Sequence, residues 1–352
     1  MAGNTFYTRP GIRRIVLLLG VVGLAITTGF LWYYFRVTKP VISLKDKKSC
    51  YLFIHTGASF NSVMDSMVTK GYLTDPESFE WLARKRSYDE HVKPGKYRLT
   101  NGMRNNALVN LLKSGMQEPV RIVIQNVRTR SDLAGRIGRS LEVDSLKLSK
   151  LFIDPSFLAG YHLSPQTLFV LFIPDTYEFY WNTSGDQLFK RMQQEYERFW
   201  TDERRKLAGT HHLSIAEVVT LASIVERESN KKEEKPAIAG VYLNRLKKGI
   251  PLQADPTVIF AWNDYRIRRV LKMHTQINSP YNTYLHTGLP PGPICLPSIS
   301  SVDAVLHAEN HAYIYFCARE DLSGYHNFAA DLETHNRNAR KYQKALDKRN
   351  IR

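Results

Sequence analysis

Cysteine is scarce in this sequence. The 352 residues include only Cys50, Cys295 and Cys317. Three is an odd number and their spacing fits no zinc motif, so the sequence predicts neither a disulfide framework nor a metal site. A bridge between Cys295 and Cys317 stays open at this point. The histidines are scattered, and no cofactor is predicted.

Acidic residues are also few. Asp and Glu number 33 against 49 Lys and Arg, which gives a net charge of +16. Such a balance favours anionic partners, nucleic acid among them. Because no compact stripe of basic and aromatic residues is available for stacking bases, we do not predict a nucleic-acid partner. Outside a membrane, lipid headgroups and acidic wall polymers are the anionic partners that remain.

One long stretch, residues 15–35, has no charge and is long enough to cross a bilayer core. It ends in four aromatic residues, 32–35, as is typical at a membrane interface. Arginines precede it, so the positive-inside rule keeps residues 1–14 in the cytoplasm and places the remainder outside. A cleaved signal peptide is the competing interpretation. Its apolar region is usually shorter, and no small-x-small cleavage site follows, so we predict an uncleaved single-pass anchor.

The rest of the chain is predicted to form a linker, residues 36–49, and two domains of overall α+β class. Residues 50–118 show the order strand, helix, helix, strand, helix of a small α+β module. Its elements are expected at 50–54, 59–70, after Asp75-Pro76, at 96–99 and at 106–113. Residues 119–352 are expected to form a mixed α/β domain that contains one long charged helix from 186 to about 207.

A carboxylate stands where a helix should be apolar. Ser214 and Glu217 form a capping box that predicts a helix start. At about 100° per residue, Glu226 falls on the same apolar stripe as Ala222, whereas Glu228 projects elsewhere. A carboxyl group held against apolar neighbours has a raised pKa, which suits a general acid. The alternative is a glutamate at the edge of the stripe that reaches solvent.

Three later segments, residues 252–257, 279–294 and 324–328, combine proline and glycine with Tyr, Asn, Thr and Gln. Proline and glycine preset rigid loops, and the other side chains offer flat faces and neutral hydrogen-bonding groups. Such loops suit a sugar polymer. Taken singly, each of them is equally compatible with a plain surface loop.

Together these segments resemble the YceG-like family of endolytic murein transglycosylases. The resemblance rests on LASIVERE at 221–228, LQADPTV at 252–258, SPYNTY and GLPPGPI within 279–294, and PDTY at 174–177. It implies a LysM-like first module and a YceG-like catalytic domain, held by the bacterial inner membrane with the catalytic domain in the periplasm. It also implies peptidoglycan glycan strands as substrate and penicillin-binding synthases as partners.

The implied reaction is cleavage between N-acetylmuramic acid and N-acetylglucosamine in nascent strands. It leaves 1,6-anhydromuramoyl ends and thereby terminates glycan polymerisation. The resemblance assigns catalysis to Glu226, and Glu228 is expected to support it without contacting substrate. The residues expected to contact glycan are Gln253, Asp255, Thr257, Ser279, Tyr281, Asn282, Thr283, Tyr284 and His326.

Several of these assignments have alternatives. Asp255 precedes a proline and could anchor its own loop. His326 lies beside aromatic residues, where a histidine is often simply packed. For the whole chain, the alternatives are a lysozyme-like hydrolase acting on the same polymer and a noncatalytic cell-wall scaffold.

Overall fold

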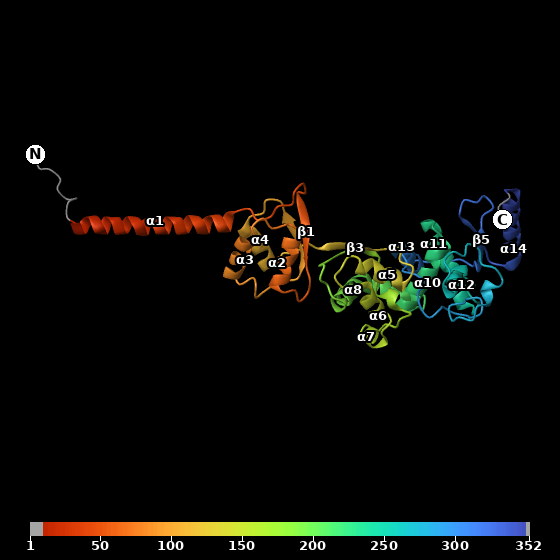
Figure 1. Cartoon of the computed structure of the whole chain (residues 1–352). Coiled ribbons are helices and arrows are strands. Elements are labelled where there is room, and N and C mark those ends of the chain that lie inside the picture. Colours follow the sequence, from red (N-terminus) through yellow and green to blue (C-terminus); the bar gives the residue numbers. More distant parts are fainter. Residues whose placement is uncertain (1–9, 350–352) are drawn as a thin grey trace, which may run out of the picture. The chain divides into compact units, whose positions relative to one another are not determined.

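The structure, a computed structural model that describes residues 10–349, mixes helices and strands and confirms the α+β class (Figure 1). The described chain divides into two compact units. The first comprises residues 10–120 together with 180–182, and the second comprises residues 121–179 and 183–349.

The first element is one long apolar helix, α1 (Pro10–Thr38). Within the described residues it is the one helix whose length and composition would allow it to cross a membrane, over 13–38. This helix contains the predicted span 15–35, so it fits a single-pass anchor. At its C-terminal end, Trp32 and Tyr33 contact Trp81 edge-on, with ring centroids 5.3 and 5.9 Å apart.

The α+β module of the first unit has the predicted elements. Strands β1 (Ser49–Ile54) and β2 (Gly95–Thr100) pair antiparallel, with Leu52 opposite Tyr97. The helices are α2 (Phe60–Thr69), α3 (Pro76–Lys85) and α4 (Asn105–Ser114). The Asp75 side chain caps α3 by accepting the Ser78 N–H.

Residues 36–49, which the sequence predicted to be a linker, contribute side chains to the core of the first unit. Val41 is fully buried and Ile42 is 2% exposed, and both belong to the core of the first unit. Ile42 forms an antiparallel bridge with Leu73, and the backbone N–H of Ser43 donates to the carbonyl of Tyr72. Composition alone indicated a basic spacer because lysines surround this short apolar segment.

The second unit is mainly helical. Its small β structure consists of β3 (Val120–Ile124) beside β4 (Asp175–Phe179) and an antiparallel hairpin of β5 (Tyr315–Ala318) and β6 (His326–Ala329). The helices before its centre are α5 (Arg130–Gly138), α6 (Ser145–Leu151), α7 (Pro155–Ala159), η1 (Leu168–Val170), α8 (Gly185–Phe199) and α9 (Asp202–Thr210). Those that follow are α10 (Ile215–Glu228), η2 (Lys232–Glu234), α11 (Lys235–Lys247), α12 (Asp255–Trp262), η3 (His274–Gln276), α13 (Ile299–Leu306) and α14 (Leu332–Lys348).

Helix α10 lies at the centre of this unit and packs against α11, α12 and α13. The single long helix predicted from residue 186 is wrong, because the chain breaks between α8 and α9. Trp200 is buried at the break, and the Thr201 hydroxyl accepts the N–H of Arg204 and so starts a new helix.

A truncation tests the boundary of the first unit. A fragment starting at Arg36 should keep the buried segment, whereas one starting at Lys45 lacks the buried Val37, Val41, Ile42 and Leu44. Burial of four aliphatic side chains predicts a loss of about 6 kcal/mol from the first unit. Hydrogen exchange of the β1 and β2 amides measures this loss. Equal protection in the two fragments would show that the segment is a spacer, and a fragment starting at Lys39 is the control.

Candidate active site

Helix α10 begins as the sequence predicts. Ser214 accepts the N–H of Glu217, and the Glu217 carboxylate accepts the N–H of Ser214, which is a complete capping box. The residues from Val218 to Val225 are all buried, so the helix has no solvent face over two turns. Glu226 is the first polar side chain beyond this buried run that reaches neighbouring elements.

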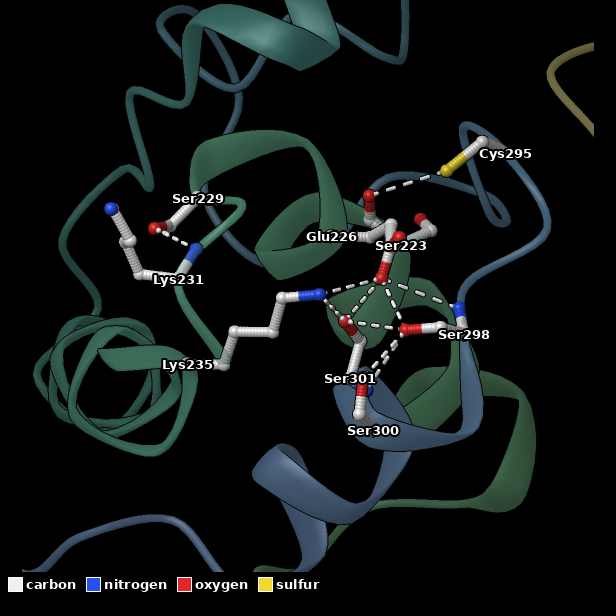
Figure 2. Close-up of polar contacts among 9 residues, drawn as sticks. All are labelled: Ser223, Glu226, Ser229, Lys231, Lys235, Cys295, Ser298, Ser300 and Ser301. Atoms are coloured by element: carbon white, nitrogen blue, oxygen red, sulfur yellow. Dashed lines mark hydrogen bonds and ion pairs between the residues drawn. The ribbon is translucent and has the colours of Figure 1, made fainter. Parts of the chain in front are cut away.

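One oxygen of Glu226 receives several hydrogen bonds (Figure 2). Lys235 Nζ donates to Oε2 over 2.8 Å, and the hydroxyls of Ser298 and Ser301 donate to the same atom. The backbone N–H of Ser298 adds a contact of 3.3 Å. No residue in the described part of the chain donates to Oε1, and the Glu226 side chain keeps 21% exposure. Oε1 is therefore the oxygen available to a ligand.

The electrostatics of Glu226 correct the expectation of a raised pKa. Burial opposes the charge and by itself raises the pKa of Glu226. The hydrogen bonds from Lys235, Ser298 and Ser301, with the positive charge of Lys235, outweigh burial and lower the pKa below its ordinary value. Without substrate, Glu226 is therefore ionised at neutral pH.

The three partners come from two further helix starts. Lys235 begins α11, and its side chain is only 6% exposed; it also donates to the Ser301 hydroxyl over 2.8 Å. Ser298 is the N-cap of α13, so the Glu226 carboxylate lies at the N-terminus of that helix. Unsatisfied N–H groups and the helix dipole favour an anion there.

Sequence reasoning missed these three residues. The serine-rich start of α13, after Pro297, carries a readable N-cap signal, and this signal marks a helix start but not an active site. Lys235 carries no such signal, since its partner lies on another helix and the pairing depends on tertiary structure.

Glu228 is a second carboxyl group, and its pKa is raised where that of Glu226 is lowered. It accepts a hydrogen bond of 2.6 Å from the Tyr242 hydroxyl. Burial raises the pKa of Glu228 to about 7, and the negative charge of Asp255 adds to the rise, against the lowering effect of the Tyr242 hydrogen bond. Asp255 itself accepts a bond of 2.6 Å from the Tyr284 hydroxyl. Glu228 and Asp255 thus form a separate polar group on the other side of α10.

Three of the residues predicted to contact glycan are buried. Thr257, Asn282 and Thr283 are at most 1% exposed, which prevents direct contact with a ligand in this conformation. The hydroxyls of Thr257 and Thr283 are 2.8 Å apart and join the start of α12, where the sequence predicted a loop, to the loop at 279–284. Asn282 donates to two backbone carbonyls of its own loop. These residues hold the loops in shape.

The other predicted contacts are accessible to different degrees. Gln253 is exposed in a left-handed conformation, with φ of 52°. Ser279 and Tyr284 are partly buried. Tyr281 packs on Phe260, with ring centroids 4.6 Å apart, and lines a cavity of about 250 Å³.

His326 is packed by a specific partner. Its Nδ1 lies 3.0 Å from Glu234 Oε2, and its backbone N–H donates to the other oxygen of Glu234. Both side chains are largely buried, at 14% and 8% exposure. The described contacts of His326 therefore tie β6 to the turn before α11, and none of them reaches Glu226.

No cluster of three or more His, Cys, Asp or Glu suited to a metal ion occurs among residues 10–349. The cysteines are free thiols. Burial raises the pKa of Cys295 to about 12, although this residue lies near the site, so its thiol is not a nucleophile at neutral pH.

The fold and the site define a class of chain: an apolar N-terminal helix, a small α+β module, and a helical unit whose buried central helix presents one carboxylate. A family model described as the YceG-like family matches residues 52–341. The chain belongs to the YceG-like family, and the resemblance inferred from its motifs is confirmed.

Similar proteins agree with this assignment. A protein of Bacillus subtilis (strain 168) named endolytic murein transglycosylase is 29% identical over 85% of this chain and 86% of its own length. A protein of the same name from Streptococcus pneumoniae serotype 2 is 25% identical over 92% of this chain, which spans 64% of that longer relative. A crystal structure of a putative YceG-like protein from Listeria monocytogenes matches this structure with a TM-score of 0.54 and 27% sequence identity. The match covers 83% of this chain and 99% of the Listeria chain.

Replacement of Lys235 tests the electrostatics of the site. Lys235→Met removes the cation and a donor but leaves Glu226 buried, so the pKa of Glu226 should rise above its value in the unchanged protein. A carboxyl-carbon NMR titration, assigned with Glu226→Gln, measures the change. Lys231→Met is the matched control, because Lys231 stacks on Tyr325, 4.7 Å from the ring centroid. An unchanged or lowered pKa in Lys235→Met would contradict the account.

Proposed function

We propose that this chain is a membrane-anchored lytic transglycosylase that cuts peptidoglycan strands internally between N-acetylmuramic acid and N-acetylglucosamine. The observation that carries the proposal is the Glu226 carboxylate, held by Lys235, Ser298 and Ser301 in a member of the YceG-like family. The names of the Bacillus and Streptococcus relatives support the same activity.

In the proposed reaction Glu226 takes up a proton as the glycan binds. Burial already opposes its charge, and a sugar chain that excludes the remaining water opposes it further. Protonated Glu226 then donates to the glycosidic oxygen, and the bond from that oxygen to the muramoyl anomeric carbon breaks. Lys235 and the two serines stabilise the carboxylate that forms, which makes Glu226 a strong acid once it is protonated.

The same carboxylate completes the reaction. It accepts the proton of the muramoyl 6-hydroxyl as that oxygen bonds to the anomeric carbon, and Glu226 regains the proton it gave. The product is a 1,6-anhydromuramoyl end. No water is consumed, because an internal hydroxyl held close to the reacting carbon replaces it.

The remaining assignments complete the proposal. Helix α1 is the anchor in the bacterial inner membrane, with its N-terminus in the cytoplasm and both units in the periplasm. The first unit is a LysM-like domain. Cleavage of nascent strands terminates their polymerisation, next to penicillin-binding synthases. Gln253, Ser279, Tyr281 and Tyr284 line the glycan path.

A lysozyme-like hydrolase is the second candidate, and one observation favours it. Glu226 is ionised while the pKa of Glu228 is raised to about 7, and glycosidases commonly pair one ionised carboxyl with one protonated carboxyl. Against it, residues two apart on a helix project to different sides, so one sugar cannot lie between the two. Transglycosylation is therefore the better supported reaction.

Two variants separate these candidates. Glu226→Gln keeps an acceptor for Lys235 and the two serines, so it should fold with reduced stability and still bind glycan, and it should lose about 10³-fold in cleavage, the usual contribution of a general acid–base group. Glu228→Gln, the matched control, should lose far less. Mass spectrometry of strands from purified peptidoglycan should find anhydromuramoyl ends. Reducing ends without the anhydro bridge, with equal losses in both variants, would identify a hydrolase; unaffected cleavage in Glu226→Gln would reject this site.

A further inference from the structure

A second group of charged residues lies close to the Glu226 site. The loop at 294–296 contacts α10 at Ser223, one helical turn before Glu226. The Ile294 N–H donates to the Ser223 hydroxyl over 2.9 Å. Figure 2 shows the second contact, in which the Cys295 thiol lies 3.6 Å from the Ser223 carbonyl. The next residue of the loop, Leu296, donates its N–H to the carbonyl of Val127. This contact places Arg128 beside the loop that holds the helix.

Arg128 is oriented but not neutralised. Its guanidinium lies over the ring of Tyr265, 4.2 Å from the centroid, and the residue is partly buried. Neither Arg128 nor the exposed Arg227 forms an ion pair with any residue between 10 and 349. Many other arginines of the chain do, for example Arg204 with Asp303 at 2.7 Å.

Arg227 lies four residues beyond Ser223 on α10 and therefore on the face that contacts the 294–296 loop, while Val127, the neighbour of Arg128, binds the same loop from the other chain segment. Both arginines thus border this loop. The direction of the Arg128 pKa agrees with this placement, because burial lowers it and the like charge of Arg227 lowers it further. Asp132 also reaches Arg128, but its carboxylate is engaged in the capping box of α5, where it accepts the N–H of Thr129. Asp132 attracts Arg128 without forming an ion pair with it, so the repulsion between the two arginines is only partly offset, and an anionic ligand would offset it further.

A cavity of about 250 Å³ is lined by Thr129, the residue after Arg128, and by Tyr265, on which Arg128 stacks; Arg128 and Arg227 themselves do not line it. Thr129, Arg130, Tyr265 and Tyr281 are among its lining residues. The Arg130 guanidinium donates to the carbonyl of Pro165 and is therefore occupied. The cavity is too small for a glycan strand and has the size of a short side group.

We propose that Arg128 and Arg227 form a subsite for a carboxylate on the muramoyl side chain of the substrate. Arg128 is preset on Tyr265, and Arg227 follows Glu226 directly in the sequence, so an anion bound there orients the muramoyl unit towards Glu226. Guanidinium groups suit this task because they bind carboxylates through paired hydrogen bonds. The inference rests on the proposed function, since it names the feature of the glycan that this site selects.

The carboxylate has two sources, which binding measurements can separate. In strands with peptide stems the carboxylates belong to the stem, because the lactyl carboxyl is used in an amide bond. In strands stripped of stems the lactyl carboxylate is free. When the lactyl carboxyl of a stripped strand is converted to a neutral methylamide, the strand has neither a stem carboxylate nor a lactyl carboxylate. Binding of these three strands to the full chain in detergent is measured with Glu226→Gln, so that no strand is cut.

In that background Arg128→Gln and Arg227→Gln should each weaken binding of carboxylate-bearing strands about tenfold, the usual scale for a charge-assisted contact. Neither should change binding of the methylamide strands. Arg340→Gln, which removes the same charge from an exposed residue of α14, is the control. A loss with stem-bearing strands alone assigns the subsite to the stem, and a loss with stripped strands assigns it to the lactyl group.

The proposal is overturned if both variants bind every strand as the control does, or if they lose as much affinity for the methylamide strands. Arg227→Gln keeps the test valid if Arg128→Gln fails to fold, because Arg227 is exposed. Cleavage by the protein with Glu226 intact is scored separately. Cleavage without arginine dependence contradicts the subsite alone, and arginine-dependent binding without cleavage contradicts the proposed function alone.

Discussion

The ion pair between Lys235 and Glu226 is the interaction on which the site depends. Lys235 is almost fully buried, and a buried ammonium group is costly unless an anion and hydrogen-bond acceptors surround it. Glu226 Oε2, 2.8 Å away, and the Ser301 hydroxyl meet that need. Removal of either charge leaves its partner buried and unpaired, which typically costs about 3–5 kcal/mol. The catalytic carboxylate is therefore also a structural centre of the second unit.

The pair also brings distant parts of the chain together. Its members stand at the end of α10 and the start of α11, and the serines that complete it begin α13. Because every contact within the described chain converges on Oε2, the carboxylate has a fixed orientation, and Oε1 is left for a ligand. This arrangement leaves Glu226 ionised in the free protein, and exclusion of water by the substrate raises its pKa so that it carries the proton it then donates.

Local signals in the sequence predicted much of this arrangement. The capping box at Ser214 and the apolar spacing after it located α10 and singled out Glu226, since both signals lie within one helix. The motifs at 252–258 and 279–294 identified the family before any tertiary contact was known. The elements of the first unit followed in the same way from alternating and helical periodicity.

What could not be predicted depends on contacts between elements. The sequence predicted a raised pKa for Glu226, and the structure shows a lowered one. The apolar neighbours of Glu226 can be read from the sequence, whereas Lys235 becomes its partner only when α10 and α11 pack together. Thr257 and Thr283 were assigned to substrate from the composition of their segments, but their burial is decided by the packing of α12 against the loop at 279–284. Residues 41–44 contribute core side chains for the same reason.

The charge of Glu226 while a glycan is bound tests the central claim most directly. A strand whose muramoyl units lack the 6-hydroxyl can bind but cannot form the anhydro bond. A carboxyl-carbon NMR titration of Glu226, with and without this strand, measures the pKa in both states. The account predicts a lowered pKa in the free protein and a clear rise on binding. A Glu226 that stays equally acidic and ionised beneath the bound strand would contradict it.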